Sequence, residues 1–253
     1  MVLEFRDDDV AISVKNLTKA FDNHIILSGL NFDIPKNKIT TILGFSGAGK
    51  STLLKHLLGL LRPTSGTVHV LGKNIFEFGP MELREFRRNF GMLFQYAALF
   101  DSFTAFENVA FPLREFTDFD EAQITKTVSE LLKATGIKDE AFHRLPGQLS
   151  GGMRKRVGLA RALALGPRIM LYDEPTTGLD PITTKMVNDL IVSTAKYHRE
   201  RGLTSLIISH DVKASLAISD FVAFLDRGRI VEFLPAKEFI RSTNPLVQEF
   251  INL

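Results

Sequence analysis

A glycine-rich stretch at residues 44–51 carries the clearest chemistry in this sequence. It reads G-F-S-G-A-G-K-S and fits the phosphate-binding pattern G-x-x-x-x-G-K-[ST]. The glycines let backbone N–H groups turn inward around phosphate oxygens, and a helix that begins at the loop adds the partial positive charge of its N-terminus. The Lys50 ammonium would then reach the β- and γ-phosphates, and the Ser51 hydroxyl would hold Mg²⁺. The alternative is a glycine-rich turn that merely precedes a core helix.

The residues on either side of this stretch predict the context that the motif requires. Residues 39–43 form an apolar run typical of a buried strand, and residues 51–60 place apolar side chains at helical spacing. A strand, a loop and a helix in this order are the setting of a phosphate-binding loop, so we favour the phosphate site over the plain turn.

Two adjacent carboxylates end a second apolar run. Residues 169–172 are apolar, and Asp173 and Glu174 follow them. This pattern predicts a buried strand whose C-terminal end enters an active-site crevice. Asp173 suits Mg²⁺, directly or through water, and Glu174 suits a general base or a residue that orients water. An ordinary acidic strand end is the alternative, and it would be favoured if this pattern stood alone.

A second helix N-terminus is predicted at residues 150–152, which read S-G-G. Ser150 is a good N-cap for a helix that runs to about residue 164, and such an N-terminus can bind an anion. The alternative is a capped helix with a solvated basic face, because four basic residues lie on it: Arg154, Lys155, Arg156 and Arg161.

Two rings at predicted strand ends allow a functional or a structural interpretation. Phe21 precedes a turn at residues 22–23, where it could stack on a nucleotide base or belong to the core or an edge strand. His210 follows a buried strand predicted at residues 203–209, and a lone histidine in that position is usually structural.

The rest of the chain alternates strand and helix patterns. Further strands are predicted at residues 11–14, 30–34 and 67–71, and a hairpin at residues 221–225 and 229–232. Residues 90–94 form a further short apolar run that ends at Gln95. A long helix is predicted from Pro181 to about Arg199, and one or two short helices in residues 237–253. We find no internal repeat, low-complexity segment or linker.

Residues 95–149 differ from the rest and predict a helical insertion. Ile124, Val128, Leu131 and Leu132 recur at helical spacing. The first part of the insertion is also rich in phenylalanine, at Phe100, Phe103, Phe106, Phe111, Phe116 and Phe119. A small insertion cannot easily bury all six rings, so they form either its own core or an apolar groove for a partner helix. The residues alone do not decide between these two.

Composition bounds the classes of function. The 253 residues can form one large or two small domains, and their net charge of +2 creates no strong field that would attract nucleic acid or anionic lipid. There is no cysteine, hence no disulfide, thiol nucleophile or cysteine-based metal site. Neither a secretory signal pattern nor an apolar run long enough to cross a bilayer is apparent. We expect a soluble, cytosolic chain that serves a membrane, if at all, through a partner.

In their order, and over nearly the whole chain, these motifs resemble those of the ATP-binding subunit of an ABC transporter. Residues 44–52 resemble the Walker A loop, 149–153 the family signature, 169–173 Walker B and 178–180 the D-loop. The resemblance makes Phe21 the adenine-stacking aromatic residue and His210 the H-loop histidine. The nucleotide-binding residues it implies are Phe21, Gly44, Phe45, Ser46, Gly47, Ala48, Gly49, Lys50, Ser51 and Thr52.

The resemblance also implies roles for the remaining motif residues. It implies Glu174, His210 and Gln95 as catalytic residues, and Ser51, Gln95 and Asp173 as residues around Mg²⁺. Two copies would pack head to tail around two ATP molecules, so that each copy presents its signature to the nucleotide of the other. The signature residues are Leu149, Ser150, Gly151, Gly152 and Met153, and the D-loop residues are Gly178, Leu179 and Asp180.

The implied fold is α/β, a P-loop NTPase (RecA-like) core with an N-terminal antiparallel β subdomain and an inserted α-helical subdomain. The core and β subdomain would comprise residues 1–95 and 155–235, the helical subdomain residues 96–154, and a C-terminal helical tail residues 236–253. All belong to one ATP-binding domain. ATP would close the dimer, hydrolysis would release it, and the insertion would carry the movement to a permease.

Within the family, residues 92–100, 107–115 and 149–153 resemble the ATPase of the Mla/Mce-type phospholipid transport systems. This implies a place at the cytoplasmic face of the bacterial inner membrane, with a membrane permease of the MlaE kind. It also implies an MCE-domain lipid-binding protein and a STAS-domain accessory protein as partners, and no nucleic acid. Met153 replaces the glutamine common in ABC signatures, as it does in this subfamily. The longer C-terminal extension of some Mla ATPases is not matched by a chain ending at Leu253.

Other functions compete with a phospholipid motor. Soluble ABC proteins of translation or DNA repair usually carry two cassettes or a long coiled-coil insertion, and this chain has neither. A small-molecule P-loop kinase would lack the signature at residues 149–153. Within transporters, the alternative is an ATPase for amino-acid, lipoprotein or other hydrophobic cargo, since cargo meets other subunits.

Overall fold

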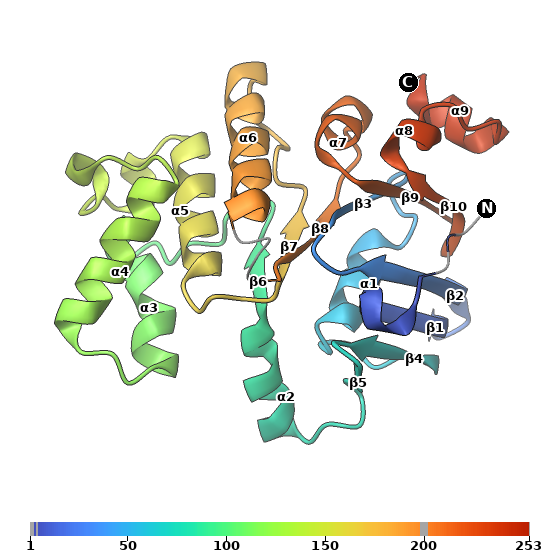
Figure 1. Ribbon diagram of the computed structural model, residues 1–253, viewed down its shortest axis with the longest axis horizontal. Coiled ribbons are helices and arrows are strands. Elements are labelled where there is room, and N and C mark those ends of the chain that lie inside the picture. Colours follow the sequence, from blue (N-terminus) through green and yellow to red (C-terminus); the bar gives the residue numbers. More distant parts are fainter. Residues whose placement is uncertain (1–2, 4, 198–201, 253) are drawn as a thin grey trace. The chain divides into compact units, whose positions relative to one another are not determined.

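The computed structural model describes residues 3, 5–197 and 202–252 (Figure 1). These residues form two compact units. Unit 1 contains the described residues up to Arg87 and from Gly202 onward, and unit 2 runs from Arg88 to Tyr197. The subdomain boundaries expected from the sequence remain a prediction.

An antiparallel sheet forms the N-terminal part of unit 1. A 3₁₀ turn, η1 (Asp7–Asp9), leads into β1 (Val10–Phe21) and β2 (His24–Pro35). These two strands pair around the predicted turn at residues 22–23. β4 (Ser65–Val70) pairs with the other edge of β1, and β5 (Lys73–Asn74) extends the sheet. The predicted strands at residues 11–14, 30–34 and 67–71 are therefore confirmed, although β1 and β2 are longer than expected.

A second sheet in unit 1 has β3 (Ile39–Leu43) between two parallel neighbours. β8 (Thr204–Ile208) pairs with one edge of β3 and β9 (Phe221–Asp226) with the other. β10 (Arg229–Pro235) runs antiparallel to β9 and completes the predicted hairpin. Every residue of β3 is buried, as expected for an apolar run covered on both faces.

Five helices belong to unit 1 in the described residues (Figure 1). They are α1 (Lys50–Leu57), α2 (Pro80–Phe86), α7 (Val212–Ile218), α8 (Ala236–Phe239) and α9 (Pro245–Ile251). The two C-terminal helices contribute Phe239, Val247 and Phe250 to an apolar cluster that also contains Leu43 and Phe224. The C-terminal helices thus pack on the end of β3, just before the glycine-rich loop.

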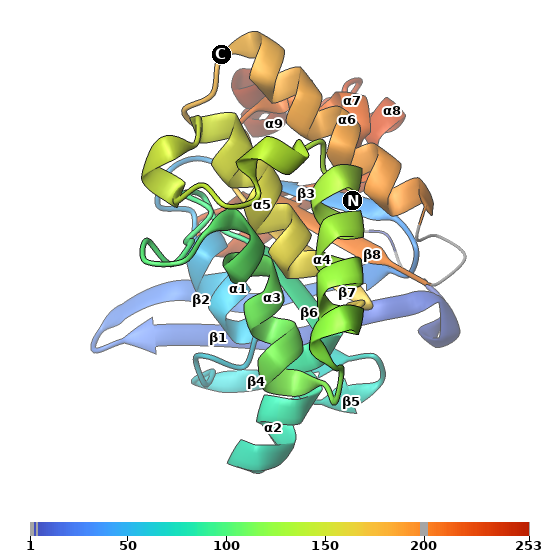
Figure 2. The ribbon, with the colours of Figure 1, turned by 90° about the vertical axis from the view of Figure 1, so that its left-hand side faces the viewer.

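Unit 2 combines a short strand pair with four helices in its described residues. β6 (Phe90–Leu93) runs parallel to β7 (Ile169–Asp173). α3 (Ala105–Phe116), α4 (Glu121–Ala134) and α5 (Gly151–Leu163) pack against one another, as Figure 2 shows, around an aliphatic core. A 3₁₀ turn, η2 (Arg87–Asn89), leads into β6. Two more, η3 (Asp139–Ala141) and η4 (Pro146–Gln148), lie between α4 and α5.

The fourth helix, α6 (Pro181–Tyr197), begins at the proline that the sequence indicated. The helix was expected to reach about Arg199, and residues 198–201 lie outside the described residues. None of the helices in the part of the chain that the structure describes is long and apolar enough to cross a membrane.

Candidate functional site

The glycine-rich loop joins β3 to α1. The Ala48 N–H donates to the Phe45 carbonyl, with 3.2 Å between N and O, and this turns the loop back on itself. Gly49 is the N-cap of α1 with φ of 106°, a conformation that favours glycine, and no side chain caps the helix. An uncapped N-terminus directs backbone N–H groups toward the loop, which is the arrangement that binds phosphate.

Neighbouring segments of unit 1 fix the loop. The Gly228 N–H donates to the Ala48 carbonyl (3.1 Å), and a side chain on Gly44 would collide with the Leu225 carbonyl oxygen. The loop therefore rests against the β9–β10 hairpin, where only glycine fits at position 44.

The Lys50 ammonium lies on the loop that it is predicted to serve. It donates to the carbonyl oxygens of Gly44 (2.6 Å) and Phe45 (3.0 Å). Ser51 is exposed in the first turn of α1, and Thr52 is half-buried. Ser46 and Gly47 are exposed at the crest of the loop. Cationic and hydroxyl groups thus lie beside the uncapped N-terminus of α1.

Phe21 and His210 also belong to unit 1. Phe21 ends β1 with 46% of its surface exposed, and the Lys19 ammonium lies 4.8 Å from its ring centroid. An exposed ring of this kind is open to stacking, unlike a core residue. His210 is exposed, two residues after the end of β8. Its neighbours are held in place, because the Ser209 N–H donates to the Ile42 carbonyl and Asp211 caps α7.

The two adjacent carboxylates end β7 in unit 2. Asp173 and Glu174 are both half-buried. Glu174 has φ of 48°, a left-handed conformation that is uncommon for a residue with a side chain. The Thr177 hydroxyl donates to Glu174 Oε2 (3.0 Å), and the Thr177 N–H donates to the Glu174 carbonyl (3.3 Å). The carboxylate is therefore held in one direction by its own loop.

Lys155 of α5 approaches these carboxylates from within the unit. Its Nζ donates to the Glu174 carbonyl oxygen at 3.3 Å, and only 5% of the residue is exposed. Burial lowers the pKa of Lys155 to about 8, against the opposing effect of the Asp173 and Glu174 carboxylates. A buried cation therefore lies beside the end of β7.

The predicted signature forms the N-terminus of α5. Ser150 is the N-cap, and its hydroxyl accepts a hydrogen bond from the Met153 N–H at 3.2 Å. Leu149 is buried in the core of unit 2, and Met153 packs partly against that core. A side chain on Gly152 would collide with Thr183 of α6, so glycine lets the two helices approach closely.

The predicted D-loop lies beside this helix end. A Cβ on Gly151 would lie 3.6 Å from the Leu179 side chain. Gly178 has φ of 77° and allows the turn. Asp180 accepts hydrogen bonds from the Thr183 hydroxyl (2.6 Å), the Thr183 N–H and the Ile182 N–H. These hydrogen bonds lower the pKa of Asp180 below its ordinary value, and the bond from the Thr183 hydroxyl has the largest effect.

Gln95 follows β6 and opens a turn with unusual backbone geometry. Ala97 and Ala98 have φ of 61° and 44°, two consecutive left-handed residues that are not glycine. Arg161 of α5 donates to both of their carbonyl oxygens, at 2.7 and 2.8 Å. The guanidinium also lies 5.9 Å from the ring centroid of Phe100. Arg161 thereby links the signature helix to the segment that follows Gln95.

The six phenylalanines in the first part of the insertion lie outside its buried core, although Phe106 packs against that core. None is buried, whereas the core of unit 2 consists of aliphatic residues and Phe142. The rings of Phe100, Phe103 and Phe111 contact one another in tilted or edge-on arrangements, with ring centroids 5.1–6.0 Å apart, and 44% of Phe100 is exposed. We call these three rings the aromatic surface. The partner groove, one of the two interpretations left open by the sequence, stays a prediction.

The solvated basic face proposed for α5 is wrong. Lys155 is buried, and Arg154, Arg156 and Arg161 are half-buried and donate to backbone carbonyls within unit 2. Sequence reasoning therefore missed Lys155, Arg161 and Thr177 as neighbours of the site residues. Helical spacing offered a signal for Lys155, because it is three residues after Gly152 and four before Leu159, which are both buried.

The expected site residues are thus distributed over both units. Unit 1 holds Phe21, residues 44–52 and His210, and unit 2 holds Gln95, the signature, Asp173, Glu174 and the D-loop. The donors proposed for Mg²⁺ are the oxygens of Ser51, Gln95 and Asp173, which are the hard ligands this ion prefers. No cluster of three or more His, Cys, Asp or Glu exists among the described residues. Such a donor set fits an ion held partly by nucleotide phosphates.

Comparison with known sequences places the chain in a family. The family model described as "ABC transporter" matches residues 27–177. The chain is 43% identical to a probable ribonucleotide transport ATP-binding protein, mkl, of Mycobacterium leprae (strain TN), over 96% of this chain and 69% of that protein. It is 46% identical to the methionine import ATP-binding protein MetN of Symbiobacterium thermophilum, over 87% of this chain and 66% of that protein.

A third relative and a solved structure add to this comparison. The intermembrane phospholipid transport system ATP-binding protein MlaF of Haemophilus influenzae is 39% identical over 95% of this chain and 89% of its own length. The dimeric, post-hydrolysis structure of the ATP-binding cassette MJ0796 with ADP and Pi superposes with a TM-score of 0.80. Its sequence identity is 31%, over 89% of this chain and 98% of that one. These matches confirm the predicted α/β fold class with its antiparallel sheet and helical insertion. The chain belongs to the ABC transporter family, as an ATP-binding subunit that hydrolyses ATP with Mg²⁺ to drive transport.

Proposed function

We propose that this subunit powers phospholipid transport between the bacterial inner and outer membranes. In this proposal it works at the cytoplasmic face of the inner membrane. Its partners would be a second copy of itself, an MlaE-like permease, an MCE-domain lipid-binding protein and a STAS-domain accessory protein. The relative from H. influenzae, named for intermembrane phospholipid transport, supports this cargo.

The observation that carries the proposal is how unit 2 joins two stretches that resemble Mla-type ATPases. Asn108, from residues 107–115, is fully buried, and its side chain accepts from the N–H of Phe100 (2.9 Å) and donates to its carbonyl (3.2 Å). Phe100 belongs to residues 92–100, and its ring lies 5.1 Å from that of Phe111. The residues of this resemblance thus supply two of the three rings of the aromatic surface, which suits an apolar helix of a permease.

We propose the following division of labour in hydrolysis. The loop at residues 44–49 and Lys50 hold the phosphates of ATP, Phe21 stacks on adenine and His210 contacts the γ-phosphate. Glu174 accepts a proton from the attacking water or orients it, and Gln95 relays the state of the nucleotide toward the aromatic surface. The signature helix at Ser150 of a second copy faces the γ-phosphate, which gives a twofold dimer with two nucleotides. Mg²⁺, bound through Ser51, Gln95 and Asp173, would neutralise phosphate charge during transfer.

Methionine or ribonucleotide import is the competing function. Relatives named for methionine import and for ribonucleotide transport are 46% and 43% identical to the chain, which is higher than the 39% of the phospholipid relative. These relatives support the assignment as a transport motor as well as the phospholipid relative does. They favour a cargo other than phospholipid.

Reconstitution of the motor with an MlaE-like permease tests the cargo. We expect an MlaE-like permease and an MCE-domain protein to co-purify with the chain. ATP should then drive transfer of fluorescent phospholipid from the reconstituted complex to acceptor vesicles, and Glu174→Gln should stop the transfer. ATP-dependent uptake of methionine or a ribonucleotide, without phospholipid transfer, would refute the phospholipid proposal and leave the ATPase assignment intact.

A further inference from the structure

Lys155 is a buried cation whose role the motifs do not account for. It lies in the second turn of α5, and its surface is 5% exposed. Buried lysines are rare, because removing an ammonium from water is costly unless the group is hydrogen-bonded or balanced by charge. An apolar residue would fill the same space without that cost. The position of the ammonium therefore calls for an explanation other than packing.

The ammonium reaches the backbone of Glu174. Nζ donates to the Glu174 carbonyl oxygen, with 3.3 Å between the two atoms. The N–H of Thr177 donates to the same oxygen at 3.3 Å, and the Thr177 hydroxyl donates to Oε2 of the carboxylate at 3.0 Å. The backbone carbonyl and the side-chain carboxylate of Glu174 thus each accept hydrogen bonds from donors within unit 2.

The backbone of Glu174 needs such support. Its φ of 48° is left-handed, and a residue with a side chain keeps that conformation only where its surroundings impose it. A change in this angle would swing the carboxylate away from its direction, because the side chain follows the Cα–Cβ bond. The hydrogen bond from Lys155 opposes that change at the carbonyl, one bond from the Cα atom.

The charges around Lys155 fit the same role. The Asp173 and Glu174 carboxylates interact favourably with the ammonium and partly offset its burial. A cation at this place also reduces the repulsion between two adjacent carboxylates, which would otherwise favour other side-chain directions. Geometry and charge therefore act on the same residue.

We propose that Lys155 is a positioning residue for ATP hydrolysis, holding the backbone of Glu174 so that its carboxylate points at the attacking water. The inference rests on the proposed role of Glu174 in hydrolysis. It assigns Lys155 no contact with ATP, water or metal. Lys155 should therefore affect the rate of the chemical step and leave nucleotide binding as it is.

Lys155→Met, which keeps an unbranched side chain reaching as far as Cε but without the donor, tests this inference. We expect kcat for ATP to fall by ~10-fold or more, the scale of a lost charge-assisted hydrogen bond. KM for ATP should stay at the wild-type value, because Lys155 binds the backbone of Glu174 and is assigned no contact with the nucleotide. Arg156→Met is the matched control, since Arg156 is the next residue of the helix and donates to Gly136 instead (2.7 Å). The control should keep the wild-type kcat.

A double-mutant cycle with Glu174→Gln separates this role from general damage. If Lys155 acts through Glu174, Lys155→Met should cause no further loss in the Glu174→Gln background, measured by single-turnover phosphate release. An equal fold loss in both backgrounds, an unchanged kcat, or a matching loss in Arg156→Met would overturn the inference. If Lys155→Met does not fold, as judged by thermal unfolding, the same cycle is decided with Lys155→Gln, which keeps an N–H donor without the charge. Wild-type hydrolysis by Glu174→Gln alone would instead refute the role of Glu174, so the two failures are distinguishable.

Discussion

The ring of Phe45 in the phosphate-binding loop packs edge-on against the ring of Phe250 in α9, with centroids 5.0 Å apart and planes at 87°. Phe45 makes a similar contact with Phe224 of β9 at 5.9 Å. The last helix of the described chain is therefore in direct contact with the loop proposed to hold the phosphates, and disturbing the helix should disturb nucleotide binding.

Phe250→Ala should weaken ATP binding as well as the fold of unit 1. Removing a buried phenylalanine costs about 3–5 kcal/mol, and the aromatic pair adds a smaller part. Phe239→Ala is the control, because Phe239 is fully buried in the same cluster without a ring contact to Phe45. Urea unfolding should show similar losses for both variants, and calorimetry should show weaker ATP binding only for Phe250→Ala. Equal ATP affinities in the two variants would contradict the coupling.

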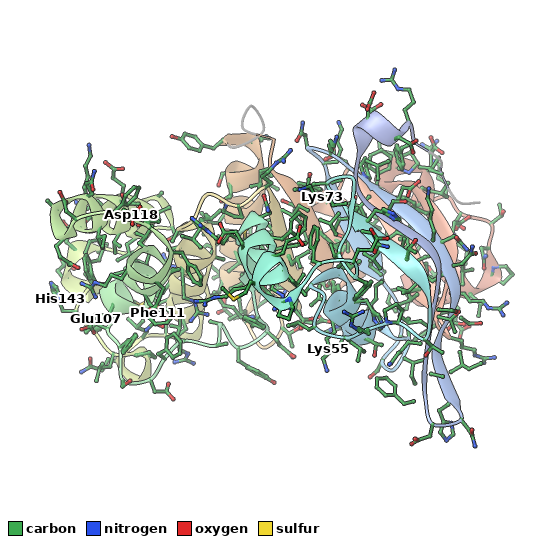
Figure 3. All side chains as sticks on the ribbon, turned by 90° about the horizontal axis from the view of Figure 1, so that it is seen from below. Lys55, Lys73, Glu107, Phe111, Asp118 and His143 are labelled. Atoms are coloured by element: carbon green, nitrogen blue, oxygen red, sulfur yellow. The ribbon has the colours of Figure 1, made fainter. Side chains whose placement is uncertain are left out.

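Lys50→Ala should abolish tight ATP binding, because a charge-assisted contact with the phosphates is lost. Lys55→Ala is the matched control, since Lys55 lies on the same helix with its side chain exposed (Figure 3). Equilibrium binding of a fluorescent ATP analogue distinguishes them. The phosphate-site assignment fails if Lys50→Ala binds as tightly as Lys55→Ala.

Glu174→Gln should bind ATP and Mg²⁺ normally but hydrolyse ATP at least ~10²-fold more slowly, the usual scale for a lost general base. The amide keeps the shape of the side chain and removes the proton acceptor. ATP should then promote a stable dimer, measurable by light scattering. Loss of binding together with hydrolysis would show that Glu174 is structural or a metal ligand instead.

Phe100→Asp should weaken assembly with the permease more than it weakens folding, because a charge within the aromatic surface cannot be buried against an apolar partner. A charge at Leu99 should act in the same direction. Phe119→Asp is the control, since 45% of Phe119 is exposed, as against 44% of Phe100, and Phe119 lies outside the aromatic surface. Wild-type co-purification of the permease with Phe100→Asp would rule this surface out as the interface.

Thr104→Val should cost the fold about 1 kcal/mol at neutral pH, because Thr104 caps α3. The N–H of Thr104 and then its hydroxyl bind the Glu107 carboxylate and lower its pKa below the ordinary 4.5 (Figure 3 labels Glu107). A lowered carboxyl pKa stabilises the fold above pH 4.5, and that stabilisation is lost as pH falls through the folded value. The stability gap between variant and wild type should therefore narrow below pH 4.5, as denaturant titrations can measure. A pH-independent gap would exclude this role for Glu107.

The sequence predicted those parts of the site that depend on neighbouring residues. The apolar strand, the glycine loop and the following helix determine one another locally, so β3, the loop and α1 lie where expected. β5 and α2 gave weak local signals and were not predicted. A short strand and a seven-residue helix contain too few residues for periodicity to show.

Contacts between distant residues could not be read from local pattern. The donors of Lys155 and Arg161 reach carbonyl groups 19 and about 63 residues away, so their roles appear only once α5 is packed. The same holds for the phenylalanines of the insertion. Their number suggested surplus apolar area, but only the structure separates the aliphatic core from the aromatic surface.

β3 has parallel partners on both edges, and every one of its residues is buried. We therefore expect its amide hydrogens to exchange with solvent far more slowly than those of the loops in unit 1. Its amide hydrogens cannot reach water through fraying of a sheet edge, so they should exchange with deuterium only when the whole unit unfolds. Exchange at Thr40–Ile42 would then report the global stability of unit 1 directly, while amides in the exposed crest of the glycine loop exchange through local motion. A comparison of the two rates with and without ATP would separate ordering of the loop from stabilisation of its scaffold.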